Sequence, residues 1–214
     1  MTDVGLLGGT FDPVHNGHLQ LAEAVLSEYR LDNILFIPAG WPPHKNSSSI
    51  TDAKHRLHML RSAIQGKPRY SVSEIELCRP EPSYTIDTLK QLQERAGNDV
   101  NFHFIIGHDA FLEIETWSRW KTLLSCLCFI IAARPGYPID GIEELLLRNN
   151  FKPETADRGV WIKSGTTNII RILSKNIIDV SSTKIRMRIA QKQHWLDLVP
   201  EKVAYYIQDN NLYR

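Results

Sequence analysis

Residues 4–18 read Val4-Gly5-Leu6-Leu7-Gly8-Gly9-Thr10-Phe11-Asp12-Pro13-Val14-His15-Asn16-Gly17-His18. The apolar residues that open this stretch predict a buried strand, and the glycines after them allow a tight turn close to a ligand. A helix is expected next, with Asn16 as a candidate N-cap. Its apolar face is formed by Leu19, Ala22, Val25 and Leu26. A strand, a glycine turn and a helix N-terminus together predict an anion site, because free N–H groups and the helix dipole favour negative charge.

Two histidines lie at the mouth of this expected site. His15 and His18 are three residues apart, so a helical turn places them on the same side, where both can face one ligand. Taken alone, the pair fits a zinc site or two structural histidines about as well as a phosphate site. The chain contains neither the G-x-G-x-x-G fingerprint nor a G-x-x-x-x-G-K-[ST] phosphate loop.

Composition narrows the class of protein. The 214 residues are 43% hydrophobic and 23% charged with a formal net charge of +1, which is typical of a globular protein without a general nucleic-acid surface. The sequence shows no signal peptide and no apolar run of about 20 residues, so we expect a cytoplasmic protein that binds neither nucleic acid nor a membrane. Without a C-x-x-C pair, the three cysteines are expected to be reduced thiols. They are Cys78, Cys126 and Cys128.

Strands and helices alternate along the rest of the chain. Further strands are expected at Asn33–Pro38, Tyr70–Leu77, Phe102–Gly107, Leu127–Ala133, Trp161–Ile162 and Asn176–Val180. Helices are expected after Thr51 as cap, from Ile86 to Gly97, from Glu143 to Arg148, and from Pro200 through Tyr206. This alternation predicts an α/β fold: a doubly wound, Rossmann-like parallel sheet with helices on both faces, plus a small C-terminal helical part. We expect a single domain over residues 1–214, with a sheet core at 1–180 and the helical part at 181–214.

Polar residues follow several of these strands. In a doubly wound sheet the ligand lies outside the carboxyl ends of the strands. The residues expected at that edge are His15, His18, His44, Lys45, Asp109 and Arg134. In the helix after Thr51, His55, Arg56, His58 and Arg61 are assigned to the solvated face, with one cation within reach of the site.

A second candidate phosphate site lies near the C-terminus. Ser181-Ser182-Thr183 offers capping hydroxyls to a helix that carries Lys184, Arg186 and Arg188. Hydroxyls and free N–H groups at a helix start, with cations one turn in, suit a phosphate. Taken alone, this segment is better interpreted as an ordinary capped basic helix.

These stretches together resemble one family nearly end to end. Residues 8–18 resemble the opening signature of the bacterial nicotinate-nucleotide adenylyltransferases, which belong to the H-x-G-H nucleotidyltransferase superfamily. Further resemblances are Pro42-Pro43-His44-Lys45, Ser83-Tyr84-Thr85, Ile106-Gly107-His108-Asp109, Thr116-Trp117 and Arg134-Pro135-Gly136-Tyr137-Pro138. Residues 180–186 resemble the family's I-S-S-T-x-I-R element, with Val180 in place of the first Ile. Residues 140–176 carry no family marker.

The resemblance implies a reaction and a set of site residues. AMP would pass from ATP to nicotinate mononucleotide with Mg²⁺, by direct in-line attack of the substrate phosphate, giving deamido-NAD and pyrophosphate for NAD biosynthesis. The implied catalytic residues are His15, His18 and Arg186. The implied ATP-binding residues are Gly8, Gly9, Thr10, Phe11, His18, Gly107, Asp109, Ser182, Thr183 and Arg186. The implied nicotinate-mononucleotide residues are His44, Lys45, Tyr84, Thr85, Trp117 and Arg134.

Metal and acceptor binding follow from the same resemblance. We expect Mg²⁺ to be held mainly by phosphates and water, because the sequence shows no carboxylate cage. Trp117 would stack on the pyridine ring, its alternative role being a core aromatic. N–H groups near Tyr84 and Thr85 would receive the nicotinate carboxylate. An amide in its place would leave a donor unpaired, at a cost of about 1–3 kcal/mol, so the acid is expected to be preferred over the amide.

Other functions remain open at this point. A phosphopantetheine adenylyltransferase has a similar opening motif, but its chain is shorter and lacks the Pro-Pro-His-Lys and Thr-Trp markers. Cytidylyltransferases are more distant. A sensor of ATP or NAD without turnover would keep its function after His18→Ala, and a zinc hydrolase built on the two histidines would depend on zinc. The partners expected are the two small-molecule substrates. A homo-oligomer and the role of residues 140–176 are left open.

Overall fold

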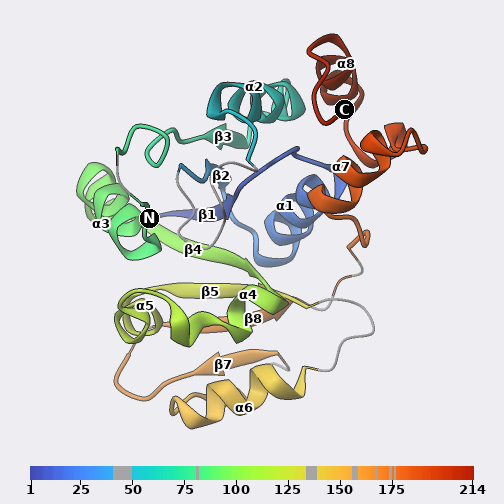
Figure 1. Ribbon diagram of the computed structural model, residues 1–214. Helices are drawn as coiled ribbons and strands as arrows, with labels where there is room; N and C mark the ends of the chain where they lie inside the picture. Colours follow the sequence, from blue (N-terminus) through green and yellow to red (C-terminus); the bar gives the residue numbers. More distant parts are fainter. Residues whose placement is uncertain are drawn as a thin grey trace. The chain divides into compact units, whose positions relative to one another are not determined.

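Figure 1 shows the computed structural model, which describes residues 1–40, 50–80, 82–133, 139–155, 159–166, 168–173, 175 and 177–214. The chain forms two compact units, each assembled from three segments. The first unit consists of Met1–Leu7, Ala24–Asn33 and Tyr84–Ile177. The second unit consists of Gly8–Glu23, Ile34–Ser83 and Ile178–Arg214. The single-domain organisation stays a prediction.

The first unit is built on a mostly parallel sheet. Its strands are β1 (Thr2–Gly9), β4 (Val100–Gly107), β5 (Cys128–Ala132), β8 (Ile169–Leu173), β7 (Val160–Ile162) and β6 (Lys152–Pro153). They pair in that order, parallel from β1 to β8, while β7 runs antiparallel to both β8 and β6. The register aligns Phe104 with Phe129 and Phe129 with Ile170, so buried rings and aliphatic chains lie across neighbouring strands. Parallel strands covered on both faces read as continuous apolar runs, as seen here.

Helices connect these strands. They are α3 (Thr85–Ala96), α4 (His108–Leu112), α5 (Trp120–Cys126) and α6 (Asp140–Arg148), together with 3₁₀ turns at Gly97–Asp99 and Ile114–Thr116. Parallel pairing of β4 with β5 requires a crossover, which α4 and α5 supply (Figure 1). Gly97 ends α3 with a φ of 67°, a left-handed conformation that glycine adopts without strain, as the sequence predicts.

The described residues of the second unit form a smaller parallel pair of strands and several helices. Its strands β2 (Asn33–Pro38) and β3 (Tyr70–Val72) are joined through α2 (Ala53–Ile64). The helices that complete it are the N-terminal part of α1 (Asn16–Tyr29), up to Glu23, and the whole of α7 (Ser182–Ala190) and α8 (Glu201–Asp209), with a 3₁₀ turn at Leu196–Leu198. Figure 1 shows α2 and α8 as neighbours, and the imidazole Nδ1 of His55 lies 2.9 Å from the hydroxyl of Tyr206 between them.

The predicted α/β class is confirmed, and most predicted elements are present. The strand at Asn33–Pro38 has the predicted bounds, and Ala22, Val25 and Leu26 are buried on the apolar face of α1. Cys78, Cys126 and Cys128 are free thiols. Within the described residues, no helix is long and apolar enough to cross a bilayer.

The predicted strand at Asn176–Val180 is wrong. Residues 177–180 are not in a strand, residue 176 lies outside the described residues, and the last strand among the described residues is β8. Ile178 is 45% exposed, and its backbone N–H donates to the side chain of Gln20 on α1. The described residues of this apolar segment therefore contact α1 and are not part of a sheet. The described part of residues 140–176, a range without a family marker, supplies α6, the parallel strand β8 and the antiparallel edge strands β7 and β6.

Three helix starts differ from the predictions by one residue. Asn16 is the first residue of α1 and not its N-cap, and its side-chain amide donates to the backbone carbonyl of Asp197. Asp52, and not Thr51, caps α2 by accepting from the Lys54 N–H, since its carboxylate is a stronger acceptor than a hydroxyl. Pro200 precedes α8 as its N-cap residue. The strand predicted at Tyr70–Leu77 ends at Val72.

Candidate active site

The loop between β1 and α1, residues 8–18, is called the signature loop below. Gly8 and Gly9 end β1, and Phe11 then takes a left-handed conformation with φ at 51°. Such a conformation is strained for a bulky residue, costing about 1–3 kcal/mol, so surrounding contacts must hold it. The Phe11 ring is buried and packs against the rings of Phe36 and His18, at centroid distances of 5.9 and 4.9 Å. A Cβ on Gly9 would lie 3.2 Å from this ring, which explains the glycine there.

The two histidines of the signature loop form a stacked pair. The ring centroids of His15 and His18 are 3.6 Å apart and the planes are inclined by 20°. The backbone N–H of His15 donates to Nδ1 of His18 at 3.2 Å, and the N–H of His18 donates to Nδ1 of His15 at 3.4 Å. Because Nδ1 of each ring accepts a hydrogen bond, the proton of each neutral ring is assigned to Nε2. Both rings therefore present Nε2–H as a donor.

Burial keeps these rings neutral in the free protein. Desolvation lowers the pKa of His15 from 6.5 to about 4. Desolvation, together with the neighbouring His15, lowers the pKa of His18 well below its ordinary value. Two imidazolium rings in such a stack would also repel each other. The arrangement offers two neutral N–H donors to an anion.

Close packing fixes the His pair in place. Gly17 lies between the two histidines, and a Cβ there would be 2.9 Å from Cγ1 of Val180 and 3.2 Å from Nδ1 of His15. A side chain at residue 17 would therefore displace the segment that leads into α7 or the His15 ring. The sequence motif requires glycine here because backbone and imidazole approach too closely for any other residue.

The two predicted phosphate sites meet in the second unit. The hydroxyl of Ser182 donates to the carbonyl of Pro13 at 2.9 Å, and Nη1 of Arg186 donates to the carbonyl of Asp12 at 2.8 Å. Nη2 of Arg186 lies 3.5 Å from the hydroxyl of Thr183. Ser181 caps α7, as predicted, by accepting from the Lys184 N–H. The start of α7 is thus fastened to the signature loop.

Arg56 was predicted to be solvated, and that prediction is wrong. Its side chain is 2% exposed and donates to three carbonyls at 2.8–2.9 Å, those of Thr51, Thr10 and Ala39. Desolvation by burial lowers the pKa of Arg56, and the negative charge of Asp12 opposes this shift. Arg56 therefore connects the signature loop, through the Thr10 carbonyl, to the carbonyls of Thr51 and Ala39. The flanking polar residues of α2 concealed this role in the sequence.

Tyr213 is a further residue that sequence reasoning missed. Its hydroxyl donates to Oδ1 of Asp12 at 2.6 Å, while Oδ2 of the same carboxylate accepts from the Thr51 N–H at 3.2 Å. Burial, and then the Asp12 charge, raise the pKa of Tyr213, so it remains a donor. The buried carboxylate of Asp12 thus connects the signature loop to the segment before α2 and to the end of the chain. No local sequence pattern signals Tyr213.

The predicted acceptor residues that are described lie in the first unit. Tyr84 precedes α3 as its N-cap residue, and Thr85 begins the helix. No side chain hydrogen bond caps this helix start. Trp117 follows the 3₁₀ turn at Ile114–Thr116, is partly exposed, and meets the Phe104 ring edge-on at 6.1 Å. Arg119 pairs with Asp87 in the first turn of α3, which joins the Trp117 segment to the start of that helix.

Two predicted ATP residues also lie in the first unit, at the end of β4. Gly107 is the last residue of the strand and the N-cap residue of α4, and a Cβ there would meet nothing within 4 Å. Asp109 is in the first turn of α4. Both therefore stand at a strand's carboxyl end, as predicted. His44, Lys45 and Arg134 lie outside the described residues. Over the parts of the chain that the structure describes, no three His, Cys, Asp or Glu side chains are grouped to hold a metal ion.

The chain is similar to known proteins over nearly its whole length. Residues 6–188 match the cytidylyltransferase-like family model. Nicotinate-nucleotide adenylyltransferase of Bacillus subtilis (strain 168) is 38% identical over 213 residues, covering 100% of this chain and 99% of the relative. A protein of Thermoanaerobacter sp. (strain X514), named as a probable nicotinate-nucleotide adenylyltransferase, is 41% identical over 99% of this chain and 94% of its own.

A solved structure shows the same fold. Plasmodium falciparum nicotinic acid mononucleotide adenylyltransferase complexed with NaAD superposes with a TM-score of 0.76 at 20% identity, covering 100% of this chain and 98% of that one. The full-length identities of 38–41% and the match to the family model establish membership. The chain therefore belongs to the cytidylyltransferase-like nucleotidyltransferases and, among them, to the nicotinate-nucleotide adenylyltransferase family.

Proposed function

We propose that this protein transfers AMP from ATP to nicotinate mononucleotide, giving deamido-NAD and pyrophosphate. The observation that carries the proposal is the reciprocally bonded pair of His15 and His18, which presents two neutral Nε2–H donors beside α7. The names of the full-length relatives supply the acceptor. With three free cysteines, the chain suits a reducing compartment, and we place the reaction in the cytoplasm.

The chemistry requires positioning and charge stabilisation. The nucleophile is the 5′-phosphate of the mononucleotide, largely dianionic at neutral pH because its second pKa is about 6. It needs no general base, so neutral imidazoles suffice as partners. His18 donates from Nε2 to the α-phosphate, where charge develops in the transition state, and His15 donates to the adjoining phosphate. A neutral donor avoids trapping the triphosphate in its ground state by an added charge.

The leaving pyrophosphate is assigned to the start of α7. Arg186 is anchored through Nη1 to the Asp12 carbonyl, which leaves Nη2 on the Thr183 side. Guanidinium and helix N–H groups are suited to phosphate oxygens. ATP enters as its magnesium complex, and the phosphates and water hold the metal as part of the substrate. Asp109 is assigned to the ribose hydroxyls of ATP.

Acceptor choice is assigned to the first unit. The uncapped N-terminus of α3 leaves N–H groups near Tyr84 and Thr85 for the nicotinate carboxylate. Trp117 stacks on the pyridine ring. A nicotinamide acceptor would bring its own NH₂ and leave a backbone donor unpaired, at a cost of about 1–3 kcal/mol. We therefore expect the acid to be used about 5- to 150-fold more efficiently than the amide.

Pyrophosphate release tests the proposal. The protein is given MgATP with nicotinate mononucleotide, nicotinamide mononucleotide or phosphopantetheine in parallel. Release predominantly with the nicotinate compound supports it, while release with phosphopantetheine would replace the acceptor. No pyrophosphate release with any of the three acceptors would favour a nucleotide sensor. The variant His18→Ala should lose at least 100-fold in kcat, because it lacks one hydrogen-bond donor to the charge that develops in the transition state. It should still bind ATP.

A further inference from the structure

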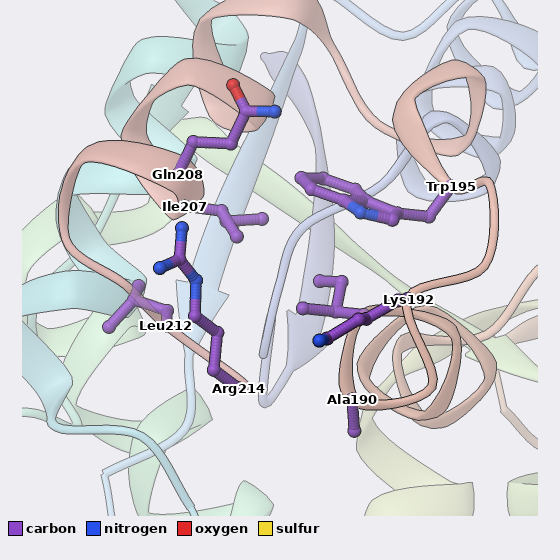
Figure 2. A pocket seen from close by; sticks show the side chains of 8 residues that line it. Ala190, Lys192, Trp195, Ile207, Gln208, Leu212 and Arg214 are labelled. Carbon is purple, nitrogen blue, oxygen red and sulfur yellow. The ribbon is translucent and has the colours of Figure 1, made fainter.

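The second unit contains a cavity that the proposed reaction does not use. Its volume is about 390 Å³, and its walls come from the C-terminal part of α7 with the residues after it, and from α8 with the residues after it. Figure 2 shows these two walls facing each other, with Trp195 and Lys192 on one and Ile207 and Arg214 on the other.

Apolar side chains form most of the lining. Ile207 is 1% exposed and Trp195 is 9% exposed, so both are fixed by the surrounding core. Ile189 and Leu212 add aliphatic surface from opposite walls. The cavity therefore suits a ligand with a hydrocarbon body, which would exchange water contact for contact with rigid apolar surface.

The polar side chains of the lining are two cations and the amide of Gln208, and none of the lining side chains is acidic. Lys192 and Arg214 reach the cavity from its opposite walls. Within the described residues, neither side chain forms an ion pair or a hydrogen bond. Two positive charges at the rim of an apolar space favour an anion, and a single carboxylate can accept from both an ammonium and a guanidinium.

Lys192 follows the end of α7 in a left-handed conformation, as residues after other helices of this chain do. Its φ is 56°, in the left-handed region, two residues after the end of α7. Glycine or asparagine usually occupies this position of a helix end, because other side chains are strained there. Here the strained residue is a lysine whose side chain reaches the cavity.

We propose that this cavity is a second binding site, for a small carboxylate with an apolar body. The hydrocarbon part lies against Ile189, Leu212 and the exposed edge of Trp195, and the carboxylate lies between Lys192 and Arg214. The site is separate in chemistry from the proposed substrate sites, which use histidines, helix N-termini and Arg186. Carboxylate binding in the cavity does not depend on the proposed function, whereas its linkage to ATP rests on that function.

Binding there is linked to the signature loop. Tyr213 lies in the chain between two lining residues, Leu212 and Arg214, and donates to Asp12. An occupant that holds residues 212–214 in place therefore also holds Tyr213 on Asp12. Because such linkage is reciprocal, ATP that orders the signature loop should tighten carboxylate binding by the factor that the carboxylate tightens ATP binding.

Octanoate is a suitable probe, with neutral octanamide as its matched control. Five tryptophans give five indole N–H signals in an NMR spectrum, and Trp195→Phe assigns the signal at the cavity. The charge variants are Lys192→Gln and Arg214→Gln. Lys202→Gln is the control, since Lys202 is an exposed lysine on α8 that bonds Gln65 and is not part of the lining.

We expect octanoate to shift the Trp195 signal saturably, with octanamide binding at least fivefold more weakly. Each cavity variant should weaken octanoate about fivefold, as loss of one partly exposed charge contact does, and Lys202→Gln should not. Equal binding of acid and amide, or equal binding by the cavity variants and the control, would overturn the site. A shift confined to the Trp117 signal would also overturn it. Equal octanoate affinity with and without ATP, or a linkage unchanged by Tyr213→Phe, would overturn the linkage.

Discussion

Replacing Arg56 by methionine removes the buried guanidinium that supports the signature loop while keeping most of the side-chain volume. Arg56 makes three hydrogen bonds of 2.8–2.9 Å to carbonyls and is 2% exposed. Hydrogen bonds from a charged group contribute about 1.5–3 kcal/mol each, but relaxation and water entry recover part of the sum. Removing one partner of a buried charged network costs about 3–5 kcal/mol, which we take as the expected loss in free energy of unfolding.

Arg61 provides the matched control on the same helix. Its side chain is 58% exposed and pairs with Glu74 at the surface, so Arg61→Met should cost at most about 1 kcal/mol. Urea denaturation of both variants measures the difference through the midpoint at constant slope. Arg56→Lys should fall between them, because it keeps the charge but loses the planar fork. Equal destabilisation by Arg56→Met and Arg61→Met would refute the assignment of Arg56 as support of the loop.

Three further predictions concern the sites. His15 has a pKa of about 4 in the folded protein and 6.5 in the unfolded chain, so the unfolded chain binds more protons between these pH values. The free energy of unfolding should therefore fall by up to about 3 kcal/mol as the pH falls from 6.5 to 4. In urea titrations, His15→Asn should make the free energy of unfolding depend less steeply on pH. Gly17→Ala should destabilise by about 1–3 kcal/mol, and adding Val180→Ala should restore part of it; a neutral Gly17→Ala would contradict the contact geometry. Trp117→Ala should raise KM for nicotinate mononucleotide about tenfold in steady-state assays and leave KM for ATP unchanged, with Trp117→Phe close to wild type.

Much of the fold and of the signature loop could be predicted from patterns over short stretches of sequence. Glycines, caps and apolar runs act over a few residues, so the strand at Asn33–Pro38 and the end of α3 at Gly97 could be predicted. Ser181 and the cations after it were recognised as a helix start for the same reason. These features depend on the chain's own backbone geometry.

Long-range burial could not be predicted in this way. Arg56 resembles its solvated neighbours, and only the carbonyls of distant loops reveal its role. Tyr213 is 201 residues from Asp12 in the sequence, so no spacing rule joins them. The apolar residues near Ile178 predict a strand, yet Ile178 contacts α1 through Gln20. The sheet strand in this part of the chain is β8, which lies earlier in the sequence.

The stereochemistry at the α-phosphorus tests the central claim most directly. ATP carrying a sulfur of one defined configuration at the α-phosphate is offered with nicotinate mononucleotide, and the configuration of the thio-substituted deamido-NAD is determined. A single in-line attack, aided by the donors of His15 and His18, predicts inversion. Retention would mean that AMP is first carried by the protein, and absence of any product would contradict the proposed transfer itself.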